Sequence, residues 1–215
     1  MEINPHNPNF YYNDLTKELT DIIWVNLKNG IKSSDGYIQW SYSNARLLED
    51  HKWFNFNFNV VRSKHMLSDY DIWASAGPDS CYEPTVSFSF VLKKGSHVKR
   101  HKIPYAELFG TVAHELHHLA QNNEENAAMS AIVYNEDDPS VMKYFLDPTE
   151  IGAFHIGFRA QASLSGESLT SIMLKYLRYQ KLAQAQKHYI VDQWLNPDFE
   201  TLIGNLSTGV NHETN

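Results

Sequence analysis

The strongest constraint on the fold is a strict alternation of large apolar and small polar residues in the first half of the chain. Residues 53–61 read WFNFNFNVV, and residues 85–92 read TVSFSFVL. Successive side chains of a β-strand point to opposite faces of the sheet, so this period of two buries one face and leaves the other polar. Together with residues 37–43 (YIQWSYS), these segments predict a sheet of three or more strands.

Helical periodicity marks the other parts of the chain. Residues 14–29 carry leucine and isoleucine at helical spacing and stop at Asn29-Gly30, which predicts an opening amphipathic helix. The β pattern does not return after Pro104, which suits the first turn of a helix that runs through Gln121. Residues 150–163 and 169–194 are also helical in period. This order of sheet, central helix and helical lobe predicts an α+β fold in one domain, residues 1–203, with a polar tail over residues 204–215.

Composition excludes several classes of protein. The chain has 215 residues, a net charge of -7 and a pI near 5.8, which argue against a nucleic-acid partner because such a surface needs excess Lys and Arg. Cys81 is the single cysteine, so any metal must be held by nitrogen and oxygen ligands. We expect a cytoplasmic protein with no signal peptide and no membrane partner, because no long apolar run occurs. The oligomeric state stays open.

The central helix contains the motif HELHH, residues 114–118. A helix places His114 and His118 on one face, one turn apart. In the pattern H-E-x-x-H, two such imidazoles bind Zn²⁺, and the glutamate takes a proton from the zinc-bound water without binding the ion. We therefore expect Zn²⁺ on His114 and His118, with Glu115 as the general base. His117 lies about 60° from His114 around the helix, which favours a place beside the site and outside the ligand set.

A third zinc ligand must come from another segment, because catalytic zinc usually takes three protein ligands and a water. The downstream segment DPTEIGAF offers Glu150 in the first turn of the next helix, on the same face as the small residues Ala153 and Gly157, which permit close approach to the central helix. The alternative is a capping box in which Glu150 only reaches back to an amide. Asp147 suits the helix cap, and His155 points about 140° away from Glu150.

These residues resemble the glutamate-type zincin metallopeptidases (H-E-x-x-H…E-x-x-A), since Glu150 follows the HELHH motif by 32 residues and Ala153 follows it. The size of the chain and the segment YFLDPTEIGAF also resemble small zincin-like proteins of tailed bacteriophages. The resemblance covers about residues 83–160. It implies a mixed sheet whose edge strand, within residues 84–92, lies above the cleft and pairs with an extended peptide. It also implies Zn²⁺ on His114, His118 and Glu150, in a protein of the host cytoplasm or the virion.

The expected function is a zinc-dependent peptidase acting on a peptide or protein substrate. Such an enzyme needs a donor that stabilises the tetrahedral oxyanion, and Tyr144, His155 and Arg159 are the candidates. Two alternatives stay open. One is a phage structural or host-interaction protein whose zinc site is structural or vestigial, and the other is a metal-dependent hydrolase of a non-peptide amide.

Three further features favour structural interpretations. The basic segment of residues 93–102 is expected to be a solvated connection, and the acidic run of residues 135–138 a turn, because it lacks the spaced ligands of a calcium loop. The tryptophans of the front half are expected in the core rather than on a sugar-binding surface. They are Trp24, Trp40, Trp53 and Trp73.

Overall fold

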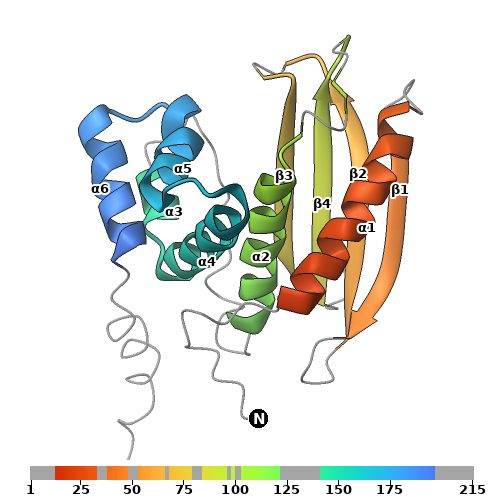
Figure 1. Ribbon diagram of the computed structural model, residues 1–215, viewed down its shortest axis with the longest axis horizontal. Coiled ribbons are helices and arrows are strands. Elements are labelled where there is room, and N and C mark those ends of the chain that lie inside the picture. The colour runs from red at the N-terminus through yellow and green to blue at the C-terminus, as the bar shows by residue number, and fades with distance from the viewer. Residues whose placement is uncertain are drawn as a thin grey trace, which may run out of the picture.

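The computed structural model describes residues 13–32, 38–47, 53–65, 68–78, 84–95, 98–99, 103–121 and 141–196 (Figure 1). Its sheet half contains α1 (Asn13–Lys32), β1 (Ile38–Leu47), β2 (Trp53–Ser63), β3 (Tyr70–Pro78), β4 (Pro84–Lys93) and α2 (Tyr105–Gln121). Its helical half contains α3 (Val141–Phe145), α4 (Pro148–Ser165), α5 (Leu169–Tyr176), the 3₁₀ turn η3 (Leu177–Tyr179) and α6 (Gln184–Leu195). The α+β order predicted from the sequence is confirmed.

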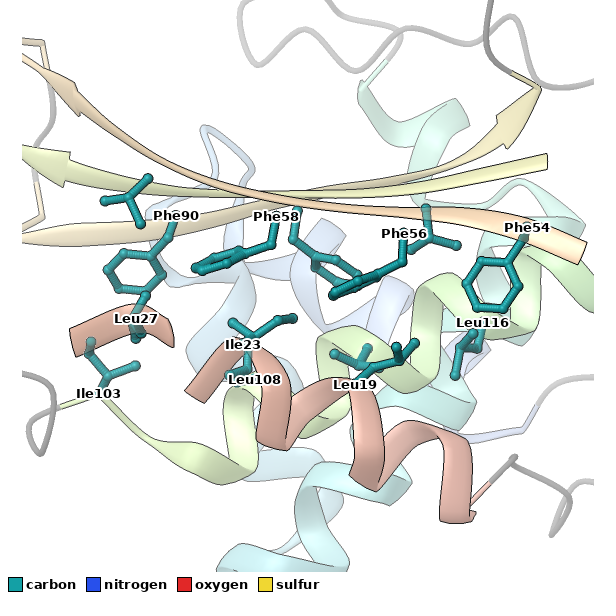
Figure 2. Close-up of a cluster of buried hydrophobic side chains, with 14 of the residues drawn as sticks. Leu19, Ile23, Leu27, Phe54, Phe56, Phe58, Phe90, Ile103, Leu108 and Leu116 are labelled. Carbon is teal, nitrogen blue, oxygen red and sulfur yellow. The ribbon is translucent and has the colours of Figure 1, made fainter. Parts of the chain in front are cut away.

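The sheet is mixed and has four strands in the order β1-β2-β4-β3. The β2–β4 pair is parallel, and the β1–β2 and β3–β4 pairs are antiparallel. Helices α1 and α2 share one face of this sheet, where Phe54, Phe56 and Phe58 of β2 lie against Leu19 of α1 and Leu116 of α2 (Figure 2). The alternating phenylalanines are thus all on the core side, as the period of two predicts.

Two expectations about the strands need correction. Strand β3 was not predicted, because its core-facing residues include the small Ala74 and Ala76, which give little hydrophobic contrast. The edge strand was expected within residues 84–92, and this is wrong: β4 pairs with β2 on one side and with β3 on the other. Among the described strands, β3 lies outermost on the side of the helical lobe and is the edge strand there (Figure 1).

The helical lobe is built around Trp194, which is completely buried. The Trp194 indole donates to the carbonyl oxygen of Phe145 at 2.9 Å, and its ring stacks on Phe154 with centroids 4.5 Å apart. The helical run predicted over residues 169–194 is divided into α5, η3 and α6, because Gln180 adopts an extended conformation. The lobe contacts the sheet half where α4 packs on α2.

Other expectations have mixed outcomes. Trp24 packs against the sheet core, but Trp73 is 60% exposed, because it lies on the outer face of the edge strand and its indole donates to Asp71. The side chains of Trp40 and Trp53, the acidic run of residues 135–138 and the tail of residues 204–215 lie outside the described residues. Within the basic segment, Lys94 and Lys99 are exposed, which agrees with a solvated connection. None of the described helices combines the length and apolarity that crossing a membrane requires.

Candidate metal centre

Helices α2 and α4 approach each other closely enough for their backbones to touch. A Cβ atom built on Gly157 would lie 2.8 Å from the carbonyl oxygen of Gly110 and 3.0 Å from the Cβ of His114. A Cβ built on Gly110 would likewise lie 2.7 Å from the carbonyl oxygen of Gly157. Neither position has room for a side chain, so the two glycines permit a crossing that no other residue allows. The small Gly157 was expected to have this role, and Gly110 was not.

The first turn of α4 carries Glu150 toward the histidines of α2. Asp147 caps this helix and accepts from the backbone N–H of Thr149 at 2.9 Å. The backbone N–H of Asp147, which Glu150 would accept from in a capping box, donates instead to the carbonyl oxygen of Tyr144 at 3.2 Å. Glu150 Oε2 lies 3.5 Å from the Nε2 atoms of both His114 and His118. Those two nitrogens are 3.1 Å apart.

These three atoms form a group that could hold a metal ion. A point equidistant from atoms with these separations lies about 2 Å from each, and zinc–nitrogen and zinc–oxygen bonds measure about 2.0–2.2 Å. Glu150 Oε2 is buried and has no hydrogen-bond partner within the described structure. A buried carboxylate oxygen without a donor is costly, and a cation shared with the two imidazoles would satisfy it. The donor set and its spacing therefore fit a divalent metal.

The charges at the site differ between its two glutamates. Burial raises the pKa of Glu150, but His114 and His118 outweigh that effect and hold the pKa well below the usual carboxyl range. Burial raises the pKa of Glu115, an effect that the two histidines only partly offset and that the neighbouring Glu150 strengthens. The Glu115 side chain is 7% exposed, and its Oε1 lies 4.0 Å from His114 Nε2. One carboxylate is thus held ionised beside the imidazoles, and the other accepts a proton more readily.

An aromatic layer from the helical lobe borders the metal group. Phe154 meets the His114 ring at an angle of 60° with centroids 4.7 Å apart, and Tyr144 meets Phe154 edge-on at 6.0 Å. The pKa of the Tyr144 phenol is raised, first by burial and then by the neighbouring Tyr176, Glu150 and Glu115. Tyr144 is therefore a neutral phenol close to the glutamates of the site.

The remaining candidates lie in different surroundings. His155 is buried in the lobe, where its Nδ1 lies 2.7 Å from the carbonyl oxygen of Trp194, so its ring faces the Trp194 core. Arg159 is near His155, whose pKa is lowered by burial first and also by this positive charge. His117 does not belong to the group of three ligand atoms found in the described part of the chain. Of the three oxyanion candidates, Tyr144 is the one whose surroundings include Glu150 and Glu115.

Comparisons with models of protein families, with curated proteins and with solved structures find no match for this chain. What the geometry of the site offers is a metal position held by two imidazoles and a carboxylate, with a second buried carboxylate beside it. That combination can activate water for attack on a polar bond.

Proposed function

We propose that the protein is a zinc-dependent peptidase of the glutamate zincin type. The observation that carries the proposal is the convergence of His114, His118 and Glu150 from two helices, with separations that suit a tetrahedral ion. Within the described residues the group contributes three ligand atoms. Three protein ligands favour a catalytic site with one open position over a closed structural site, which usually has four.

Glu115 and Glu150 have different roles in the proposed hydrolysis. When bound, zinc supplies a Lewis acid that polarises a carbonyl and lowers the pKa of water toward about 7. Glu115 accepts the proton from the attacking water and passes it to the leaving amine. Its burial supports this role, because burial raises the pKa of Glu115 and so strengthens the carboxylate as a proton acceptor. Glu150 stays ionised as a ligand.

The edge strand supports a peptide as the substrate. The side of β3 that faces away from β4 pairs with no other described strand, so its N–H and C=O groups can pair with an extended chain. Tyr70 of β3 donates to Glu107 of α2 at 3.1 Å, and this bond ties the edge strand to the helix that carries the histidines. We therefore propose β3, in place of the segment expected from the sequence, as the strand that aligns the substrate.

Three variants test the proposal. Glu115→Gln should keep its zinc, measured by mass spectrometry of the purified chain, and lose hydrolysis of a quenched-fluorescence peptide library. His118→Ala should lose the zinc as well. His117→Ala is the matched control, since it removes a neighbouring imidazole outside the ligand group, and it should keep both properties. Unchanged peptide hydrolysis by Glu115→Gln, or equal zinc in wild type and His118→Ala, would refute the assignment.

A further inference from the structure

Strand β3 has a regular set of backbone groups that face away from β4. The Lys93 N–H donates to the carbonyl oxygen of Asp69 at 3.0 Å, just before β3 begins. In an antiparallel pair, residues that bond to the partner strand alternate with residues whose N–H and C=O groups point the other way. Counted from Asp69 in the β3–β4 register, Trp73 bonds to β4, and the alternate residues point to the free edge. They are Ile72, Ala74 and Ala76.

Asp71 limits this free edge and also holds the indole of Trp73. Its Oδ1 accepts from the backbone N–H of Ile72 at 2.9 Å, and its Oδ2 accepts from the Trp73 indole at 2.8 Å. The first bond satisfies one N–H of the edge, so the open part begins at Ala74. The strand ends at Pro78, which has no N–H. The open edge is therefore short, and a fixed indole lies beside it.

A peptide paired with this edge would place its side chains alternately on the two faces of the sheet. A residue opposite Ala74 would turn toward α2, which packs against β3 and carries the histidines. A residue opposite Trp73 would lie on the outer face, beside an indole that is 60% exposed. Opposed side chains on one face are about 5 Å apart and contact each other. Edge strands usually carry charges that discourage pairing, so an exposed tryptophan at this position favours a partner with an apolar side chain.

We propose that Trp73 is a specificity-determining residue, which binds a large apolar side chain of an extended peptide paired with β3. The inference rests on the proposed function, because the peptide is the substrate of the metal centre. The short open edge favours a peptide over a second copy of the chain, since a stable interface between two proteins buries about 1,200–2,000 Å². The substrate is thus a polypeptide segment with an aromatic or branched apolar residue, whose side chain lies on the face of the sheet opposite to α2.

Paired peptides test this role of Trp73. Zinc-loaded wild type is given quenched-fluorescence peptides in which Phe or Ala stands at one position at a time. At the position opposite Trp73, Phe should raise kcat/KM over Ala by about three- to tenfold, as expected for an aromatic pair across strands. Trp73→Ser should abolish this preference, and Trp73→Phe, which keeps an aromatic ring, should retain most of it. The matched control is Tyr179→Ser, which removes an aromatic side chain that is 68% exposed on the helical lobe and should leave the preference unchanged.

The outcomes separate this inference from the proposed function. If wild type cleaves the peptides and Trp73→Ser keeps the preference for Phe, the role of Trp73 is refuted and the peptidase stands. If no peptide is cleaved, the proposed function fails, and fluorescence anisotropy of the same peptides on the protein tests the docking alone. Tighter binding of the Phe peptide that is lost in Trp73→Ser then supports the docking, and equal binding refutes it. If sedimentation shows a wild-type dimer that Trp73→Ser dissociates, a second copy occupies the edge and the peptide-binding role is overturned.

Discussion

Substituting Gly157 by alanine tests whether the helix crossing creates the metal centre. The added Cβ would lie 2.8 Å from the carbonyl oxygen of Gly110, whereas ordinary contacts begin at 3.4 Å. Both clashing partners of this methyl group, the Gly110 carbonyl and the Cβ of His114, are attached directly to α2. Neither can move aside as the end of a flexible side chain would, so the helices must separate by about half an ångström at this point.

The consequence for stability is small because two effects oppose each other. Alanine in place of a helical glycine contributes about 1 kcal/mol of helix propensity. Overpacking a close contact costs about 1–3 kcal/mol. We therefore expect the free energy of unfolding of Gly157→Ala without metal, measured in urea, to fall by no more than about 2 kcal/mol.

The consequence for metal binding should be larger. Glu150 lies two helical turns before Gly157, on the helix that must move, and functional groups tolerate about 0.5 Å of displacement. We expect the zinc Kd to rise at least tenfold, a change of about 1.4 kcal/mol in binding free energy. Gly77→Ala is the control, because a Cβ there meets nothing within 4 Å. If Gly157→Ala is more stable than wild type and binds zinc equally well, the close crossing is not what brings Glu150 to the histidines.

Two further substitutions test contacts inside the sheet half and inside the helical lobe, respectively. Burial raises the pKa of Glu107, and this effect outweighs the hydrogen bond that Tyr70 donates to the carboxylate. The Glu107 carboxyl therefore binds a proton more tightly in the folded state than in the unfolded chain. The folded state consequently loses stability as the pH rises and Glu107 ionises. Glu107→Gln should therefore raise the free energy of unfolding near pH 7 and change it little near pH 4. Urea unfolding at the two pH values measures this, and an equal change at both would contradict the expectation. Trp194→Phe removes the donor to the buried Phe145 carbonyl and leaves a cavity. We expect the free energy of unfolding in urea to fall by about 2–4 kcal/mol. A fall below about 0.5 kcal/mol would show that Trp194 does not organise the lobe.

The strands that could be predicted are those whose burial is recorded in their own sequence. In β2, phenylalanine alternates with asparagine, and the difference in hydrophobicity between the two faces identifies both the strand and its core side. In β3 the core side includes the small Ala74 and Ala76, and the outer side carries the large Trp73, so the difference in hydrophobicity between the two faces is small. The position of β4 inside the sheet depends on its parallel pairing with β2, a contact between distant segments that no local pattern encodes.

In the metal group, too, some features follow from local sequence and others depend on contacts between distant segments. The spacing of His114 and His118 follows from the geometry of one helix, so the motif predicts it directly. The place of Glu150 depends on how two helices cross, and the sequence left ligation and capping open. In the structure the Asp147 N–H donates to the carbonyl oxygen of Tyr144, and Oε2 of Glu150 lies beside the histidines. Gly110 lowers the helix propensity of the central helix. A glycine inside a helical pattern therefore indicates a close packing contact, and this was the feature of the sequence that could have predicted the crossing.

The three metal ligands come from two parts of the chain that have separate hydrophobic cores. The histidines belong to α2, whose Leu108 and Val112 are buried against the sheet, and Glu150 belongs to α4, whose Phe154 is buried against Trp194. Each part is fixed by its own hydrophobic core, so neither has to rearrange to present its ligands. The glycine crossing sets the distance between them. A metal ion bound there would bridge the two cores, so the affinity of the site and the stability of the α2–α4 contact are two measures of the same geometry.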